Sequence, residues 1–348
     1  DDEDITPPNR PQASSSYSNR ANHFPRTNGI TDLPENMKPP EWLTDSKPKR
    51  SPYFPQVGDE VVYFRSGHQE YIDKVREGSI YPLPPNTKPF KLRGSDTDEI
   101  FAKIEEVQYL LKPETRLVEL TMAVINPDEE ETETNIVFKI KYHDVENVCD
   151  FIILKELYDK SIGREWKTGD DFRSVIDDKW WAGKILTIAQ SEPHSFFKCF
   201  GVIWLNGEEE NLSPWDLEPL KRGKRATTSA EQANEGVALT NEEKVNYNSF
   251  ECSEITDEER HRLLDGFIRI MQFSQSEMFT CPVDLNQYPL YAMTIPYPIA
   301  LSTIKSRIEN KFYRRKEAIK SDAWHIYTNA EMYNEPGSEI VKKAKIVA

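Results

Sequence analysis

The sequence has 348 residues and a formal net charge of −15, and 37% of its residues are hydrophobic. A chain of this length usually folds into two or three domains, and a strongly acidic chain favours basic tails over nucleic-acid phosphates as partners. No apolar stretch approaches the roughly 20 residues that a membrane span needs. The four cysteines form no Cys-x-x-Cys pair, so we expect no structural metal. No cofactor is expected, and the lack of an apolar span predicts no membrane association.

Residues 1–52 are rich in Pro, Ser, Asn and charged residues and poor in aliphatic ones. Such a segment buries too little apolar surface to offset the entropy of ordering it, which predicts a disordered linker. Trp42 and Leu43 form its one exposed anchor, which can dock on a neighbouring domain. The chain begins at Asp1 with neither an initiator Met nor a signal peptide, so we expect it to be part of a longer protein.

Two β-rich segments follow, over residues 53–165 and 166–220. Their short apolar runs are separated by Gly, Asp and Pro turns, and residues 136–142 alternate apolar and polar with a period of two. Strands are predicted over 57–64, 101–109, 117–125, 136–142, 170–176, 180–188 and 196–204, and a short helix over 150–160. This pattern is typical of small all-β barrels.

The last part of the chain has helical periodicity. A polar segment over 221–255, which begins with a basic run at Lys221–Arg225, is predicted to be a linker. After it, Thr256 and Glu259 have capping-box spacing, and apolar residues then recur every three or four positions. We expect an all-α bundle of four helices over 256–348, C-terminally incomplete because its last helix begins near Ser338 and is truncated at Ala348.

One constellation of residues in this helical part resembles a bromodomain, a four-helix fold that binds acetyl-lysine. It comprises Phe279, Pro282, Val283, Tyr291, Tyr333, Asn334 and Ile340. The resemblance implies that Phe279, Pro282 and Val283 line an apolar slot, that the Tyr291 hydroxyl holds a pocket water, and that Ile340 is the gatekeeper beyond Tyr333.

In this resemblance the Asn334 amide anchors the ligand. An acetylated lysine is a neutral amide, so an apolar slot accepts its stem and one well-placed donor satisfies its carbonyl. The alternative is that Asn334 is an ordinary helix C-cap before Glu335-Pro336-Gly337. Glu277 and Ala300 depart from the family pattern, and the first opens one wall of the slot.

A second constellation, over residues 169–216, resembles a Tudor domain. Trp181 and Trp204 fall on positions that build the aromatic cage of that family, and Asn206 and Glu208 fall in its polar loop. Indole faces with nearby negative charge are suited to a methylated ammonium. The alternative is that these tryptophans are barrel core. Because strand faces alternate, one of the adjacent pair points inward, and we expect Trp181 in the cage and Trp180 in the core beneath it.

Together, a divergent Tudor-like first lobe, a Tudor-like barrel and a bromodomain resemble the bromodomain and WD-repeat protein family. The runs Asn310–Arg315 and Tyr333–Pro336 add specificity. The resemblance implies a nuclear, non-catalytic chromatin reader that binds methylated lysine on the histone H3 tail, at lysine 4, and acetylated histones in the nucleosome. It also implies a link to a cullin-type ubiquitin ligase through regions outside this chain.

Three other functions compete with this interpretation. An enzyme is not expected, because His143-Asp144 and Asp177-Asp178 have no accompanying phosphate loop, metal cluster or nucleophile elbow. A scaffold with degenerate pockets, acting through protein contacts, is the main alternative, and Glu277 and Ala300 favour it. A contact with nucleosomal DNA through Lys221–Arg225 or Arg314–Lys316 also stays open.

Overall fold

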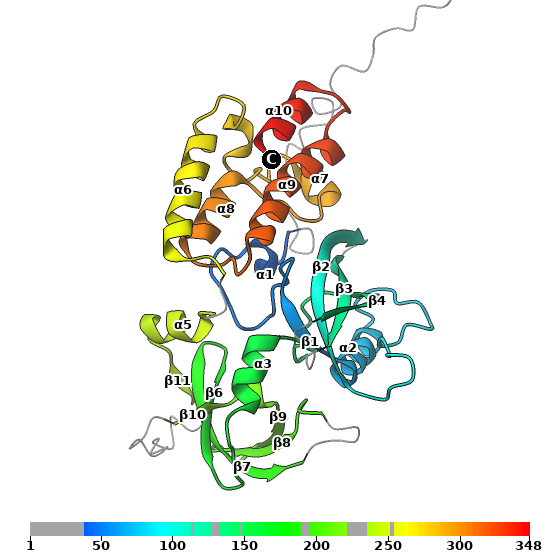
Figure 1. Ribbon diagram of the computed structural model, residues 1–348, viewed down its shortest axis with the longest axis vertical. Helices are drawn as coiled ribbons and strands as arrows, with labels where there is room; N and C mark the ends of the chain where they lie inside the picture. The colour runs from blue at the N-terminus through cyan, green and yellow to red at the C-terminus, as the bar shows by residue number, and fades with distance from the viewer. Residues whose placement is uncertain are drawn as a thin grey trace, which may run out of the picture.

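A computed structural model describes residues 38–112, 115–126, 132–146, 148–189, 195–220, 235–250 and 254–348. Two antiparallel sheets are followed by a helical bundle, which confirms the predicted fold class (Figure 1). The predictions for residues 1–37 and for the basic run 221–225 lie outside the described residues. No helix in the described ranges is long and apolar enough to cross a membrane.

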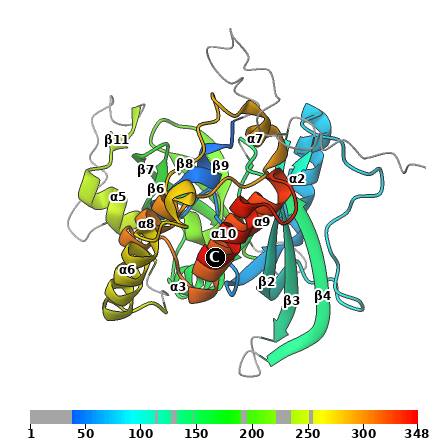
Figure 2. The same cartoon turned by 90° about the horizontal axis from the view of Figure 1, so that it is seen from above.

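The first lobe is a five-stranded antiparallel sheet with strand order β4-β3-β2-β1-β5. Its elements are β1 (Glu60–Phe64), α2 (Arg65–Gly78), β2 (Glu99–Lys112), β3 (Thr115–Asn126), β4 (Thr132–Tyr142) and β5 (Ile152–Leu154). Figure 2 shows β2, β3 and β4 running side by side as a long curved ribbon. Helix α2 was not predicted, although Tyr71 and Val75, four residues apart, are both buried in the core. The helix predicted over 150–160 divides into β5 and α3 (Lys155–Ile162).

The second lobe is a small barrel with strand order β10-β6-β7-β8-β9. Its elements are β6 (Asp171–Ile176), β7 (Lys179–Ile188), β8 (Phe200–Trp204), β9 (Glu209–Leu212), η2 (Pro214–Asp216) and β10 (Glu218–Pro219). Its core is built on Phe172, which is fully buried. Gly183 is required opposite this ring, because a Cβ there would lie 2.8 Å from it.

Asp216 in η2 makes the stability of this barrel depend on pH. Burial raises the pKa of the Asp216 carboxyl to about 7, and its Oδ2 accepts the Ser213 N–H at 2.9 Å. The pKa of this carboxyl is higher in the folded than in the unfolded chain, so its contribution to stability is fully present below about pH 4. The contribution is lost as the pH rises through 7, because the buried carboxyl must then ionise. Since an asparagine oxygen can accept the same bond, Asp216→Asn is expected to be more stable than the parent by about 1–2 kcal/mol at pH 8.

Thermal unfolding at pH 5 and pH 8 tests this expectation. The advantage of Asp216→Asn should be largest at pH 8 and small at pH 5. Asp265→Asn, at an exposed position on the bundle, removes the same charge and should show no such dependence. An equal effect of Asp216→Asn at both pH values would contradict the assignment.

The predicted linker 221–255 contains regular structure where it is described. Strand β11 (Val237–Ala238) pairs with β7, and helix α5 (Asn241–Asn248) follows it. The helix is stabilised by a capping box between Thr240 and Glu243 rather than by a buried face, since none of its residues is buried. Helix α5 thus has the polar composition of a linker. Strand β11, which precedes it and pairs with β7, holds the helix against the barrel.

The bundle comprises α6 (Asp257–Met271), η3 (Glu277–Phe279), α7 (Pro289–Thr294), α8 (Leu301–Glu309), α9 (Lys316–Tyr333) and α10 (Glu339–Val347). Helix α6 packs against α8, and α7, α8 and α10 all pack against α9. The predicted capping box at the start of α6 is confirmed, because the Thr256 hydroxyl accepts the Glu259 N–H. The predicted helix after Pro298 begins at Leu301.

Residues 38–52 are not a disordered linker. They include helix α1 (Glu41–Thr44), and Trp42 and Leu43 are buried in the main hydrophobic core. Arg307 of α8 donates to the carbonyl oxygens of Leu43 and Asp45 at 2.8 and 2.9 Å. The prediction failed because the segment has little apolar surface of its own, and its order depends on partners more than 260 residues away in sequence.

The first lobe and the bundle share one hydrophobic core. Tyr109 of β2 stacks on Tyr297 with ring centroids 3.8 Å apart. Arg314 donates to the Asp59 carboxylate at 2.7 Å, and both side chains are buried. These contacts place the bundle directly on the sheet.

Candidate functional site

The acetyl-lysine constellation lies at the end of the bundle where α7, α9 and α10 meet (Figure 1). Tyr291 comes from α7 and Tyr333 from the last turn of α9, and the structure brings their rings into edge-to-face contact at 4.9 Å. Of the other predicted residues, Pro282 is exposed, and three are half-buried: Phe279, Val283 and Ile340. Partly exposed apolar side chains of this kind suit the wall of an open apolar slot.

Tyr291 keeps its proton in this environment. Its side chain is 9% exposed. Burial, followed by the neighbouring Tyr333, raises the pKa of the Tyr291 hydroxyl to about 12. The group is therefore a neutral hydroxyl that can both donate and accept, as the tyrosine that holds a pocket water must.

Asn334 is the C-cap residue of α9, and its backbone is extended. Its Nδ2 donates to the Ala330 carbonyl oxygen at 2.8 Å, so the capping role considered from the sequence is present. An amide nitrogen carries two donors, and one bond to the helix leaves the second for a ligand. The two roles of Asn334 are compatible.

Arg116 supports this region from another lobe, and sequence reasoning missed it. It lies on β3 and donates to the carbonyl oxygens of Ala292, Ile295 and Pro296 at 2.5, 2.6 and 2.9 Å. These carbonyls lie one, four and five residues after Tyr291 in the chain. No local pattern could have identified Arg116, because its partners lie 176 or more positions away.

The two departures from the family pattern lie in different environments. Glu277 begins η3 and is exposed, whereas Ala300 is 2% exposed at the start of α8. The glutamate therefore stands at the surface, and the alanine contributes to the core.

The barrel places Trp204 and Trp181 on its inner face. Trp204 is 6% exposed, packs against Phe172 at 5.2 Å and donates its indole N–H to Glu210 at 3.0 Å. Trp181 is half-buried against the same core, and its buried indole N–H has no partner among the described residues. On this face Trp204 is thus buried, whereas Trp181 is partly exposed.

The segment before β11 lies on Trp181. A Cβ added at Gly236 would be 2.9 Å from the Trp181 ring, and Gly236 has a positive φ of 68° that suits glycine. The mouth of the predicted cage is therefore partly covered by the protein's own backbone.

Trp180 does not lie in the barrel core as predicted. The Arg173 guanidinium lies 3.7 Å above its ring, and Tyr247 of α5 contacts the ring edge at 5.7 Å. One of the two adjacent tryptophans does face the barrel core, but it is Trp181, and Trp180 lies on the opposite face of β7 beneath α5.

Asn206 and Glu208 form the turn between β8 and β9. The Asn206 amide donates to the Glu208 carboxylate, and the Glu208 N–H donates to Asn206 Oδ1, both at 3.0 Å. With Glu209 beside them, they give the turn an acidic surface. These are suitable surroundings for a cationic peptide.

The pairs that could suggest an enzyme have structural partners. His143 Nδ1 lies 3.2 Å from the Tyr71 hydroxyl, and burial lowers the pKa of His143 to about 4. Asp177 and Asp178 form the tight turn between β6 and β7 with positive φ, and Asp178 pairs with Lys244 at 2.7 Å. The described residues contain no group of three or more His, Cys, Asp or Glu that could hold a metal ion.

Comparison with known families gives one match to the two β-rich lobes and another to the helical bundle. The model of the BRWD/PHIP ancillary domain-like domain matches residues 51–226, about half of the chain, and the bromodomain model matches residues 262–346. A bromodomain and WD repeat-containing protein of Dictyostelium discoideum is 40% identical over 72 residues, which are 21% of this chain and 3% of that protein.

Two further relatives match shorter fractions of the chain. The chromatin structure-remodeling complex subunit snf21 of Schizosaccharomyces pombe is 46% identical over 57 residues, 16% of this chain and 5% of the relative. The transcription initiation factor TFIID subunit 1b of Arabidopsis thaliana is 31% identical over 68 residues, 20% of this chain and 4% of the relative. The chain thus spans a small part of the length of these curated relatives.

Proposed function

Because this chain belongs to the BRWD/PHIP family and carries a bromodomain, we propose that it is a nuclear chromatin reader. The bundle binds acetyl-lysine on histones, and the barrel binds a methylated lysine on the histone H3 tail, at lysine 4. The observation that carries the proposal is the pair Tyr291 and Tyr333 beside Asn334, with Tyr291 neutral and buried. The nucleosome is then the common partner, and any cullin-type ubiquitin ligase would be engaged by regions outside this chain.

The acetyl-lysine site is tested by Asn334→Asp. The substitution keeps the shape of the side chain and replaces an amide donor with an ionised acceptor, which would face the ligand carbonyl. Losing a hydrogen bond in a buried site costs about 1–3 kcal/mol, so acetylated histone peptides are expected to bind at least tenfold more weakly. Isothermal titration with the whole chain measures the change.

Gln272→Glu provides the matched control, because it adds one negative charge at an exposed position at the end of α6. It should bind acetylated peptides like the parent. If Asn334→Asp is folded and binds acetyl-lysine as tightly as the parent, recognition does not involve Asn334.

The methyl-lysine site is best tested at Trp181. Trp204→Ala would also remove barrel core, where truncation of a tryptophan costs about 3–5 kcal/mol. Trp181→Ala removes a partly open wall, and the lost cation–π contact is expected to weaken binding of a lysine-4-methylated H3 peptide about five- to thirtyfold. Fluorescence anisotropy with the labelled peptide measures this.

Trp324→Ala is the control for tryptophan loss, since Trp324 is 52% exposed on α9. Its peptide affinity should stay within twofold of the parent. Unchanged affinity in folded Trp181→Ala would place any methyl-lysine site elsewhere.

A scaffold remains the second candidate function, and two observations favour it. Glu277 is exposed at the start of η3, and the backbone at Gly236 covers Trp181. A ligand bound only by the native state must raise the melting temperature. A folded chain whose melting temperature rises with neither acetyl-lysine nor methyl-lysine peptides would support the scaffold and contradict the reader.

A further inference from the structure

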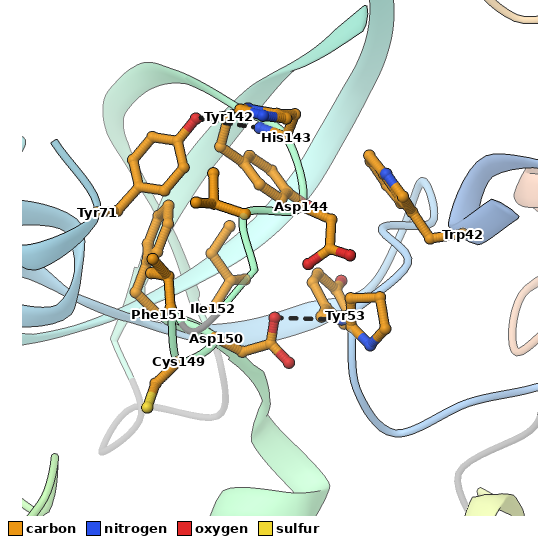
Figure 3. Close-up of a pocket in the computed structure, with 13 residues that line it drawn as sticks. Trp42, Tyr53, Tyr71, Tyr142, His143, Asp144, Cys149, Asp150, Phe151 and Ile152 are labelled. Atoms are coloured by element: carbon orange, nitrogen blue, oxygen red, sulfur yellow. Dashed lines mark hydrogen bonds between the residues drawn. The ribbon is translucent and has the colours of Figure 1, made fainter. Parts of the chain in front are cut away.

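The first lobe contains a small cavity that neither proposed pocket includes. It has a volume of about 20 Å³ and lies between α1 and the segment that joins β4 to β5 (Figure 3). Its aromatic lining includes Trp42, Tyr53, Tyr71, Tyr142, His143 and Phe151. A cavity of this size has room for about one water-sized group.

Two carboxylates enter the aromatic lining. Figure 3 shows the carboxyl groups of Asp144 and Asp150 pointing into the space beside Tyr53. Asp150 accepts the Tyr53 N–H at 3.3 Å, and burial raises the pKa of Asp150 to about 6. Burial also raises the pKa of Asp144. Two acidic groups in partly desolvated positions are costly unless a cation accompanies them.

Tyr142 supplies an independent sign that a ligand group is needed here. Its side chain is 7% exposed, and its buried hydroxyl has no hydrogen-bond partner among the described residues. Buried hydroxyls are nearly always paired. The Tyr142 ring runs nearly parallel to that of Trp42, at 24° with centroids 6.4 Å apart. Burial, and then the charges of Asp150 and Asp144, raise the pKa of Tyr142 well above its usual value, so the hydroxyl stays neutral.

The cations that act on Tyr142 and Asp144 are paired with other groups. Arg314 acts on Tyr142, but its guanidinium is bound to Asp59 at 2.7 Å. Lys49 acts electrostatically on Asp144, but its Nζ lies 2.6 Å from Asp45 and 3.7 Å from Glu41. Among the described residues, Lys49 therefore makes its short ion pair with Asp45 and not with Asp144 or Asp150.

We propose that this cavity binds the primary ammonium group of a lysine side chain from a partner peptide. The Asp144 and Asp150 carboxylates and the Tyr142 oxygen offer acceptors for the three N–H donors of an ammonium, and the face of Trp42 attracts its charge. A quaternary ammonium has no N–H to donate and exceeds a water-sized space. The site therefore differs in preference from a cage for trimethyl-lysine.

Titration of the whole chain with methylammonium chloride tests the proposal. The indole N–H of Trp42, assigned with Trp42→Phe, is followed by nitrogen-edited NMR. A saturable shift in the millimolar range is expected with methylammonium and not with equal concentrations of sodium or tetramethylammonium chloride. A response to sodium chloride of the same size, or a stronger response to tetramethylammonium, would overturn the proposal.

Asp144→Asn is the deciding variant, since Asp144 lies at the exposed rim and its loss need not unfold the lobe. It is expected to weaken methylammonium binding at least fivefold, whereas Asp265→Asn, which removes the same charge from the bundle, leaves it unchanged. Equal binding by both variants would overturn the proposal. A melting temperature equal to that of the parent would show that the lobe of Asp144→Asn is folded.

Two further comparisons distinguish sources of the ammonium group. Nα-acetyl-lysine methylamide, which keeps its side-chain ammonium, is expected to bind like methylammonium. Glycine methylamide, which carries only an α-ammonium, is expected to bind more weakly. The reverse order would assign the cavity to a chain terminus instead of a lysine side chain and overturn this assignment. Lys49→Gln is expected to leave affinity within twofold. A tenfold gain would show that Lys49 itself fills the cavity in solution, which would also overturn it.

Discussion

Arg307→Met is expected to lower the free energy of unfolding by about 3–5 kcal/mol, because it removes one partner of a buried ion pair. The Arg307 side chain is fully buried, and its Nη1 lies 2.8 Å from the Asp322 carboxylate. The same guanidinium bonds to Tyr297 and to the carbonyl oxygens of Leu43 and Asp45. The methionine would leave the Asp322 charge and two carbonyls without these donors.

Urea unfolding of the parent and the variant measures this loss. The double variant Arg307→Met with Asp322→Asn is expected to recover part of the stability, because it removes the stranded charge. Arg262→Met, which breaks the exposed pair with Glu258, should cost less than about 1 kcal/mol. A loss below about 1 kcal/mol in Arg307→Met would show that the buried network contributes little.

The same variant should release the segment that precedes the first lobe. Arg307 holds α1 through the Leu43 and Asp45 carbonyls, so limited proteolysis between residues 38 and 52 is expected to accelerate in Arg307→Met. Arg262→Met should be cleaved at the parent rate. Unchanged cleavage in Arg307→Met would show that burial of Trp42 and Leu43 is sufficient to hold the segment.

Arg116→Met is expected to weaken acetyl-lysine binding about tenfold, although Arg116 lies on the sheet of the first lobe. Its guanidinium donates to the carbonyls of Ala292, Ile295 and Pro296, which follow the pocket residue Tyr291. Burial lowers the pKa of Arg116 to about 10, so it is still a cation at neutral pH. Without these donors the turn after α7 loses its anchor, and buried carbonyls are left unsatisfied at about 1–3 kcal/mol each.

Peptide titration and thermal unfolding together check this expectation. Arg116→Lys keeps the charge but not the planar set of donors, so its affinity should fall between those of the parent and Arg116→Met. A folded Arg116→Met protein with parental affinity would mean that the bundle forms its pocket without the first lobe. The prediction rests on the acetyl-lysine function and fails with it if the parent binds no acetylated peptide.

The sequence by itself determined the fold class and much of the candidate pocket in the bundle. Period-two alternation identified β4, and apolar residues every three or four positions identified α6 and α9, because these spacings follow from backbone geometry alone. Tyr291 and Asn334 were identified through a resemblance that depends on fixed offsets within one bundle. The cap of Asn334 is local, because it bonds to Ala330 four positions earlier, whereas the contact of Tyr291 with Tyr333 joins two helices.

Only the tertiary structure revealed the contacts between residues that lie far apart in the sequence. The order of residues 38–52 depends on Arg307, and the support of the pocket turn depends on Arg116, in both cases through partners more than 170 positions away. Backbone carbonyls accept these bonds, and a carbonyl carries no mark of its residue type, so no sequence pattern reveals the pairing. The outer face of β7 could not be assigned for a similar reason. Trp180 lies beneath α5, whose polar composition indicated only a linker.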